Sequence, residues 1–522
     1  MSESTWQFDL FEPGMTMFHR AGLVGLLASL ETHCMGEAVR EKVSGNVLTV
    51  EGLGESAEDI HHLLQTIYRL DDGLIQFPVF GRLLHRTLAD IQNVLLQTFL
   101  QHPQSRQTEA EFRMKGGEGE NQARYKPLTD FNHRSKGTAE LIAESRKTGK
   151  FIRVAGWALP GAVAKHIAHN QTSWEDTPER FLLLMCAPLG SLYFNAQSYD
   201  AAGDWDKRTQ SIIVIPQVSD LQDQADRLSE YYAERSQVTK IGLVAGVTDA
   251  VLQTAIEMKL PALAYEQGVQ FYALRFGGVV WSKQQKTRTS AVTIRHIDQE
   301  ARKRYFSVLQ EFGNVARVSA KGATYGLVMP MREQIAKNLL QGDPWYLGFH
   351  EYMHGKRRWL MMTKEWREGM SALVENRDNW NSELKKGFID VMQKAVNNRL
   401  GKVYHQAVNG GSDTKRAFSR EYEKMILSFQ HCRTKEALRE TLMRFVANTY
   451  PRLKSDNPDQ LTEREILHRS VFEGEVDWKE LRDLCLLAIA TYRGSHAVEL
   501  DDVLSDTEDK DDIQLTAEET VQ

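Results

Sequence analysis

The residues HEYMH, at positions 350–354, are the sharpest catalytic pattern in the chain. On an α-helix, His350 and His354 would face one side at a spacing of four residues, and Glu351 could act as general base on a zinc-bound water. Against a metal site, Gly355 follows at once and the cationic run 356–358 disfavours a dication. A zinc metallopeptidase is therefore the alternative function, and a structural or surface histidine pair is the simpler interpretation.

The segment 345–367 around this pattern interleaves aromatic and basic residues. Its central cations are Lys356, Arg357 and Arg358, with Trp345 and Trp366 among the flanking rings. Aromatic rings stack on bases while cations neutralise phosphates, so the composition predicts nucleic-acid contact. A core of aromatic rings under a solvated charged face explains the same composition equally well.

A second basic stretch covers residues 281–304. Polar residues fill a predicted turn between two strands, as expected for phosphate contact from a hairpin tip. An exposed lysine-rich hairpin without a ligand remains the alternative. The candidate contacts are Lys283, Lys286, Arg288 and Arg295.

Residues 102–137 lose all periodicity, which is long for a structureless connection and is typical of a functional or disordered loop. Glycines permit close backbone approach, and cations outnumber acidic residues at its centre. We expect this loop to enter a DNA groove, with a disordered surface loop as the competing interpretation. The candidate residues are Gly116, Gly117, Gln122, Arg124 and Lys126.

Bulk properties narrow the class of protein. The net charge of -6 hides an acidic tail, because residues 499–522 hold ten acidic side chains against Lys510, and the remaining body is mildly basic. Such a body is compatible with nucleic-acid binding. Four scattered cysteines without a CxxC pair argue against disulfides and thiolate zinc sites. No apolar run is long enough for a membrane span, and we expect a cytoplasmic protein.

Other enzyme signatures are missing from the sequence. It contains no GxxxxGK[ST] phosphate loop, no GxSxG elbow and no GxGxxG that opens a helix. No pattern in the sequence calls for a cofactor, and we expect none.

The elements that position these residues follow from periodicity. Helices are predicted over 16–30, 57–70 and 80–100, and a short strand over 47–50. From residue 150 to 331 the pattern becomes β-rich, with helices over 221–235 and 248–258. The candidate strands there are FIRVAGWAL, RFLLLMCAPL, SIIVIPQV, KIGLVAG, VQFYALRF and SAVTIRHI.

Beyond residue 380 the strand pattern ends and five amphipathic segments predict a helical bundle. They cover 383–406, 415–430, 435–450, 462–472 and 477–492. The expected fold class is α+β, with a mixed α/β N-terminal body and a C-terminal helical bundle. We predict a helical part (1–101), the basic loop (102–137), an α/β body (138–375), the bundle (376–498) and a disordered acidic tail (499–522).

The chain opens with LFEPGMTMFHRAGLVGLLASL, an extended start followed by an apolar, nearly uncharged helix. Thr16 is placed to cap this helix, and its small residues, Ala21, Gly22, Gly25 and Ala28, let another backbone approach closely. Taken alone, the pattern indicates a buried helix of a large protein. The PGMT…HRAGLVGLL opening also resembles the N-terminus of the large subunit of type I CRISPR Cascade complexes, the Cas-eight family, in the subtype I-B-related lineage called Myxan.

This resemblance implies a non-enzymatic, RNA-guided DNA-binding subunit. The family's large subunit reads the protospacer-adjacent motif (PAM) beside the target and helps to open the duplex for guide pairing. The implied partners are CRISPR RNA, target double-stranded DNA, and the backbone, crRNA-end-binding and small subunits, with transposition proteins in transposon-associated systems. The C-terminal bundle corresponds to the region that stands in for the small subunit. The alternatives are the zinc peptidase above and a scaffold protein without nucleic-acid contact.

Overall fold

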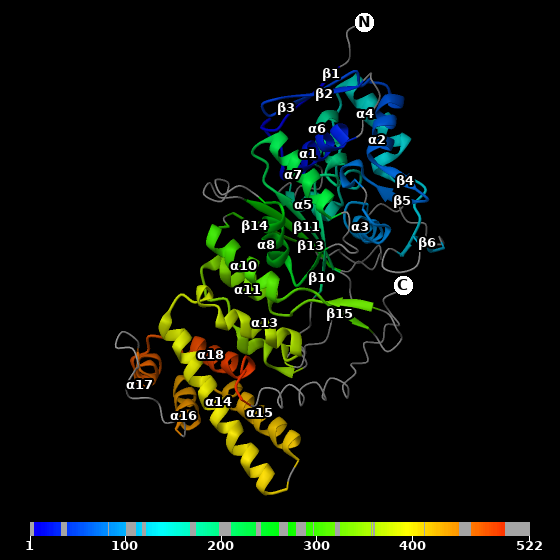
Figure 1. Cartoon of the computed structure of the whole chain (residues 1–522). Coiled ribbons are helices and arrows are strands. Elements are labelled where there is room, and N and C mark those ends of the chain that lie inside the picture. Colours follow the sequence, from blue (N-terminus) through cyan, green and yellow to red (C-terminus); the bar gives the residue numbers. More distant parts are fainter. Residues whose placement is uncertain are drawn as a thin grey trace. The chain divides into compact units, whose positions relative to one another are not determined.

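The computed structural model describes residues 5–32, 39–81, 83–100, 111–116, 122–167, 174–197, 210–235, 242–259, 270–277, 289–295, 297–318, 324–355, 358, 361–411, 413–447 and 461–495. The chain divides into two compact units, which are described separately. Unit 1 comprises Met1–Ala196 and Arg208–Gln299, and unit 2 comprises Gln197–Lys207 and Glu300–Gln522. Figure 1 shows strands mainly in the first unit and the helical bundle in the second.

The largest sheet of unit 1 has five strands in the order β12-β10-β11-β13-β14. Neighbours are antiparallel except β10 and β12, which run parallel. Every residue of β11 is buried, so both faces of the sheet centre are covered, and α1, α3 and α8 pack there. The strands are β10 (Leu192–Ala196), β11 (Gln210–Pro216), β12 (Gly242–Val244), β13 (Phe271–Phe276) and β14 (Thr289–Ile294).

Smaller sheets carry the rest of the strands in this unit. The first has the order β1-β3-β2, and three two-stranded pairs follow. Their strands are β1 (Thr5–Asp9), β2 (Arg40–Ser44), β3 (Val47–Glu51), β4 (Arg69–Asp71) with β5 (Leu74–Gln76), β6 (Arg113–Lys115) with β7 (Ala123–Tyr125), and β8 (Ile152–Arg153) with β9 (Glu175–Asp176).

The helices of unit 1 include the predicted opening helix, which extends to residue 32. They are α1 (Met17–Thr32), α2 (Ala57–Ile67), α3 (His85–Gln97), α4 (Lys136–Thr148), α5 (Gly161–Ile167), α6 (Pro178–Cys186), α7 (Leu221–Glu234) and α8 (Val247–Glu257), with 3-10 turns η1 (Pro78–Phe80) and η3 (Asn132–Arg134). α3 begins at His85, five residues later than predicted, because the 3-10 turn η1 ends at Phe80 and the N-cap residue Leu84 is extended.

One predicted strand is wrong: RFLLLMCAPL forms helix α6. A short run of apolar residues has no period that separates a buried strand from a buried helix. The deciding residues precede it, because Thr177 accepts a hydrogen bond from Arg180 N and Pro178 occupies the first turn. FIRVAGWAL is also overestimated as a strand, since only Ile152–Arg153 pairs with β9.

Unit 2 begins with helices and one hairpin and ends in the predicted bundle. Its elements are α10 (Gln299–Glu311), β15 (Val315–Val318), β16 (Thr324–Leu327), α11 (Arg332–Gln341), η4 (Phe349–Tyr352), α13 (Lys364–Glu375), η5 (Arg377–Asn379), α14 (Glu383–Asn409), α15 (Thr414–Gln430), α16 (Lys435–Val446), α17 (Glu463–Leu467), the π-helix η6 (His468–Glu473) and α18 (Trp478–Ala490). The predicted α+β class, with a mixed α/β body and a C-terminal helical bundle, is confirmed.

The bundle is centred on α14 and α18, which pack on each other (Figure 1, yellow and red). The buried guanidinium of Arg367 in α13 donates hydrogen bonds to Ala490 O at 3.2 Å and Tyr492 O at 3.4 Å. These carbonyls lie at the end of α18, where a cation also complements the helix dipole.

In the described ranges no helix is both long enough and apolar enough to cross a membrane.

α1 is the central helix of unit 1, buried on all sides apart from its ends and Arg20. The predicted close backbone approach occurs against α6 and the turn after it. A Cβ at Gly22 would lie 1.8 Å from Leu183 O, and one at Gly190 would lie 1.9 Å from Ala21 O. The backbones are in direct contact at both glycines, so moving the two segments apart would open a cavity in the core.

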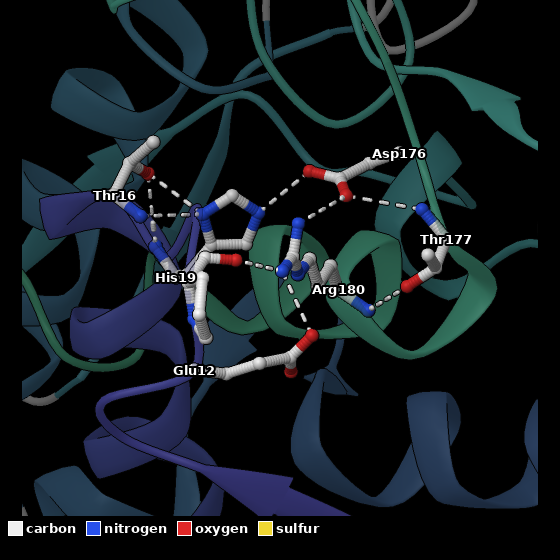
Figure 2. A network of polar contacts seen from close by, with 7 residues as sticks. Glu12, Thr16, His19, Asp176, Thr177 and Arg180 are labelled. Carbon is white, nitrogen blue, oxygen red and sulfur yellow. Dashed lines mark hydrogen bonds and ion pairs between the residues drawn. The ribbon is translucent and has the colours of Figure 1, made fainter.

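The His19 network, formed by Glu12, Thr16, His19, Asp176 and Arg180, ties the start of α1 to the segment before α6 (Figure 2). Thr16 N donates to His19 Nδ1 at 3.0 Å, so the other ring nitrogen, Nε2, donates to Asp176 Oδ2 at 2.9 Å. Arg180 lies 3.6 Å from the second oxygen of Asp176 and donates to Glu12 at 2.8 Å. The histidine and Asp176 are both buried.

Gly14 completes this arrangement. Its φ of +93° is in the left-handed region, and a Cβ there would lie 2.8 Å from Arg180 Nη1. The residues Pro13, Gly14, Thr16 and His19 of the opening motif thus have structural roles around one buried hydrogen bond, between His19 and Asp176.

We expect Gly22→Ala to lower the free energy of unfolding by at least about 2 kcal/mol, because the new methyl group overlaps a backbone carbonyl of α6. Gly137→Ala, in the exposed first turn of α4 with open space around it, is the matched control and should leave stability unchanged or slightly higher. Urea-unfolding midpoints measure both. Equal midpoints for the two variants would contradict the close approach.

We also expect an acid-sensitive stability that depends on His133. Complete burial lowers the pKa of this histidine to about 4, while its Nε2 donates to Ala158 O at 3.1 Å. The unfolded chain therefore binds a proton below about pH 6.5 that the folded chain does not bind, and stability falls as the pH drops from about 6.5 towards 4. The loss reaches about 2 kcal/mol at pH 5.

His133→Gln should make the unfolding free energy less dependent on pH between 7.5 and 5, while the exposed His62→Gln should keep the wild-type dependence. Urea titrations at the two pH values provide the test. The same pH dependence in wild type and His133→Gln would show that this histidine is not the cause.

Candidate nucleic-acid interface

The candidate interface is the β6–β7 hairpin, which lies within the predicted basic loop. The tight turn between β4 and β5 supports it: Asp72 and Gly73 have positive φ values of 54° and 79°, as a two-residue hairpin turn requires. Asp71 and Asp72 of this turn pair with Lys115 and Arg113. The pKa of Asp71 is lowered, chiefly because Lys115 donates a hydrogen bond to it.

Two further contacts hold the hairpin in place. The hydroxyl of Tyr125 donates to Asp72 O at 3.0 Å, and its ring is buried. The buried amide of Gln92 in α3 accepts from Ile75 N at 2.8 Å and donates to Lys126 O at 2.6 Å. One face of the hairpin is therefore fixed to the fold through its backbone and through paired charges.

The opposite face of the hairpin carries exposed side chains. Since Met114 pairs with Arg124 in the register, both point to this side, and Phe112 and Lys126 extend it. The Arg124 guanidinium lies 4.4 Å from the centre of the Phe112 ring, and Lys126 Nζ lies 5.4 Å from it. Phe112 is 40% exposed and Met114 is 55% exposed. These four residues are named the outer hairpin face.

The chemistry of the outer hairpin face suits nucleic acid. Throughout the part of the chain that the structure describes, no carboxylate pairs with Arg124 or Lys126, in contrast to Arg113 and Lys115 on the inner side. A guanidinium that rests on an aromatic ring keeps its charge for phosphate and its plane for a base. Within the described ranges, the face thus combines two cations that have no carboxylate partner with flat and apolar surface.

Of the predicted loop residues, Arg124 and Lys126 lie on this face, and Gln122 is exposed directly before β7. Gly116 follows β6 with a φ of +95°, a conformation that favours glycine. Gly117 lies outside the described residues. The loop prediction missed Phe112 and Met114, although the alternation in EFRMK was the visible indication of a strand with one exposed face.

The aromatic rings described in segment 345–367 are not exposed for stacking on bases. Trp345, Tyr346, Phe349 and Trp366 are all buried, so the alternative left open, a core of rings, is the one present. Arg358 pairs with Glu423 at 3.1 Å. Lys356 and Arg357 lie outside the described residues.

The HEYMH residues do not form the α-helix that a zinc peptidase needs. The 3-10 turn η4 ends at Tyr352, before His354. His350 Nδ1 lies 2.7 Å from the buried carboxylate of Asp483, which also accepts from His350 N and Gly348 N. His350 thus joins η4 to α18. Across the described residues no three His, Cys, Asp or Glu side chains are grouped as a metal site, Glu351 included.

The remaining candidates come from the stretch 281–304. Arg295 is exposed directly after β14, the edge strand of the large sheet. Lys283, Lys286 and Arg288 lie outside the described residues. Their nucleic-acid contact stays a prediction.

Comparison with known proteins finds family matches in the N-terminal and C-terminal parts of the chain. Residues 7–185, which contain the His19 network and the hairpin, match the DevT N-terminal domain, and residues 375–520 match the DevT C-terminal domain. A CRISPR-associated protein Cas8a1/Csx13 of Myxococcus xanthus (strain DK1622) is 24% identical over 542 residues, which cover 94% of this chain and 90% of that protein. With matches to both DevT domains and similarity to the Cas8a1/Csx13 protein along nearly its whole length, the chain is Cas8-like.

Proposed function

We propose that the chain is the large subunit of an RNA-guided CRISPR effector complex of the Cascade type, in the subtype I-B-related lineage, and that it recognises target DNA. In this role it binds and positions nucleic acid rather than catalysing a reaction. Its partners are CRISPR RNA, target double-stranded DNA, and the backbone, crRNA-end-binding and small subunits. The complex serves defence or RNA-guided transposition, depending on the proteins that bind it after assembly.

The observation that carries the proposal is the outer hairpin face. Arg124 and Lys126 are held over Phe112 by a hairpin whose other cations are already paired, so these two charges are available to a polyanion. Guide pairing supplies most of the sequence recognition in such complexes, and the protein needs only to contact a short motif and the phosphates beside it. A rigid, supported hairpin suits this task.

The same face also suits local opening of the duplex. Phe112 and Met114 are exposed apolar side chains beside the two cations. Apolar side chains that enter between base steps unstack them, and the cations offset part of this cost by contacting phosphates. We therefore assign PAM contact and duplex destabilisation to the outer hairpin face.

The double variant Arg124→Ala with Lys126→Ala should weaken binding of the assembled complex to target duplex. Because two phosphate contacts are lost, the slope of log binding constant against log salt concentration should become shallower by about 2. The control Lys136→Ala with Lys337→Ala removes the same charge from exposed helical lysines that already pair with Glu140 and Glu333. Fluorescence anisotropy at several salt concentrations gives the slope for each protein. Equal slopes for the Arg124→Ala, Lys126→Ala variant and the control variant would contradict the proposal.

Phe112→Leu tests the flat ring separately, because it keeps an apolar side chain and removes the stacking surface. We expect about tenfold weaker binding to a target with unpaired bases beside the motif, within the range found for one base stacked on an aromatic ring. Binding to fully paired non-target duplex should change little, since the cations remain. Equal losses on both ligands would mean that Phe112 acts only by supporting Arg124.

A further inference from the structure

The outermost strand of the five-stranded sheet, β14, has an open edge. It pairs with β13 on one side, from Thr289 opposite Phe276 to Ile294 opposite Phe271, and it is the last strand in the sheet order. In an antiparallel ladder, alternate residues direct their N–H and C=O groups away from the neighbouring strand. Within the described part of the chain, residues 290–294 form no hydrogen bonds beyond this ladder. About half of the backbone groups of β14 can therefore pair with another strand.

β14 lacks the features that protect two other sheet edges from such pairing. β12, at the opposite edge of the same sheet, is only three residues long. β2, at an edge of the first small sheet, carries the exposed charges of Arg40, Glu41 and Lys42. Short strands and charged side chains both discourage the addition of a strand. β14 reads TSAVTI, without a charge, proline or glycine, and its register has no bulge.

The side chains of β14 continue a buried apolar face to the edge of the sheet. Because side chains alternate along a strand, Val292 and Ile294 share one face. They lie opposite Ala273 and Phe271 of β13, which are both buried. Helix α5 packs near β14 but leaves residues 290–293 exposed, and Val292 is 39% exposed. A strand added at this edge would cover Val292 with an apolar side chain of its own.

The residues around β14 define the charge of the segment that fits. Arg295 is exposed directly after the strand, and the sequence before it contains Lys283, Lys286 and Arg288. No acidic residue occurs in the sequence from 271 to 297. An added strand with carboxylates at both ends would therefore meet opposite charge at each end.

A second copy of β14 fits this edge poorly. If two copies paired antiparallel over the whole strand, Arg288 of one copy would follow opposite Arg295 of the other at both ends. Like charges directly opposite each other destabilise a strand pair. A nucleic-acid strand offers phosphates to the cations but lacks the alternating N–H and C=O groups that pair with a sheet edge. The edge therefore favours a peptide segment of different sequence.

We propose that the β14 edge binds an extended segment of a partner protein by strand addition. The segment has apolar side chains at alternate positions, on the face of Val292, and carboxylates at both ends. Main-chain hydrogen bonds supply the attachment, while Val292 and the flanking cations select the sequence. This interaction is separate from the nucleic-acid contact proposed above and does not rest on it.

The test uses the full-length chain and a labelled synthetic peptide, EEVTVTVEE, which has the required pattern. N-methylation of alternate residues removes the N–H donors from one edge of the peptide. We therefore compare a peptide that is N-methylated at its valines with one that is N-methylated at its threonines. A strand pairs with β14 through one edge only, so one of the two peptides should bind like the parent. The other should bind about tenfold more weakly, as expected for the loss of two hydrogen bonds. Fluorescence anisotropy measures the affinities.

Val292→Lys separates strand addition from charge attraction. We expect about threefold weaker binding of the parent peptide, because an apolar cross-strand pair is lost. Simple attraction of an acidic peptide would instead become stronger with the added cation. Arg295→Glu should also weaken binding, while the matched control Lys42→Glu, with the same change of charge on edge strand β2, should not. All three residues are exposed, so the variants should fold, and circular dichroism verifies this.

Equal affinities of the two methylated peptides overturn the inference, and so does tighter binding by Val292→Lys. A dimer of the full-length chain that Val292→Lys dissociates, measured by sedimentation, would assign the edge to a second copy and contradict the partner segment. Absence of peptide binding together with DNA binding that Arg295→Glu weakens would assign the flanking cations to nucleic acid, which also overturns the proposal.

Discussion

The backbone contact between α1 and α6 is the constraint on which the rest of unit 1 depends. Gly22 and Gly190 leave no space for a Cβ, so the two segments approach as closely as polypeptide backbones can. Because α1 is buried on nearly every side, this contact also determines where α7 and β11 pack. The His19 network then fixes the register at the start of α1, since His19 and Asp176 are both removed from water and each satisfies the other.

This arrangement separates the residues of the opening motif from those that we propose to contact a ligand. Gly14, Thr16 and His19 of the opening motif have structural roles, because they surround or form a buried polar network (Figure 2). The exposed chemistry lies on the β6–β7 hairpin, whose inner cations are neutralised by Asp71 and Asp72. Among the residues that the structure describes, carboxylates pair with the inner cations and none pairs with Arg124 or Lys126, so the hairpin has a defined orientation and keeps two cations for a ligand. Rigid support of this kind reduces the entropy that a contact loses on binding.

The sequence predicted local patterns well and tertiary pairings poorly. The bundle helices and four strands of the five-stranded sheet were predicted near their observed bounds, because amphipathic spacing is a local property, whereas β10 was missed. RFLLLMCAPL was assigned to a strand because its apolar run has no period, and the capping role of Thr177 went unnoticed. Arg124 and Lys126 were predicted from loop composition, but the pairing of Arg113 with Asp72 depends on residues about forty positions away. The burial of Trp345 and Trp366 was likewise undecidable from residue types.

We propose that the outer hairpin face contacts target DNA while the opening motif only builds the fold. Photo-crosslinking from position 114 tests it most directly, because Met114 is 55% exposed on that face and forms no part of the His19 network. With a photo-reactive phenylalanine analogue in place of Met114 in the assembled, guide-loaded complex, we expect cross-links to target DNA beside the guide-paired segment. Cross-links confined to other protein subunits, with none to DNA, would contradict it.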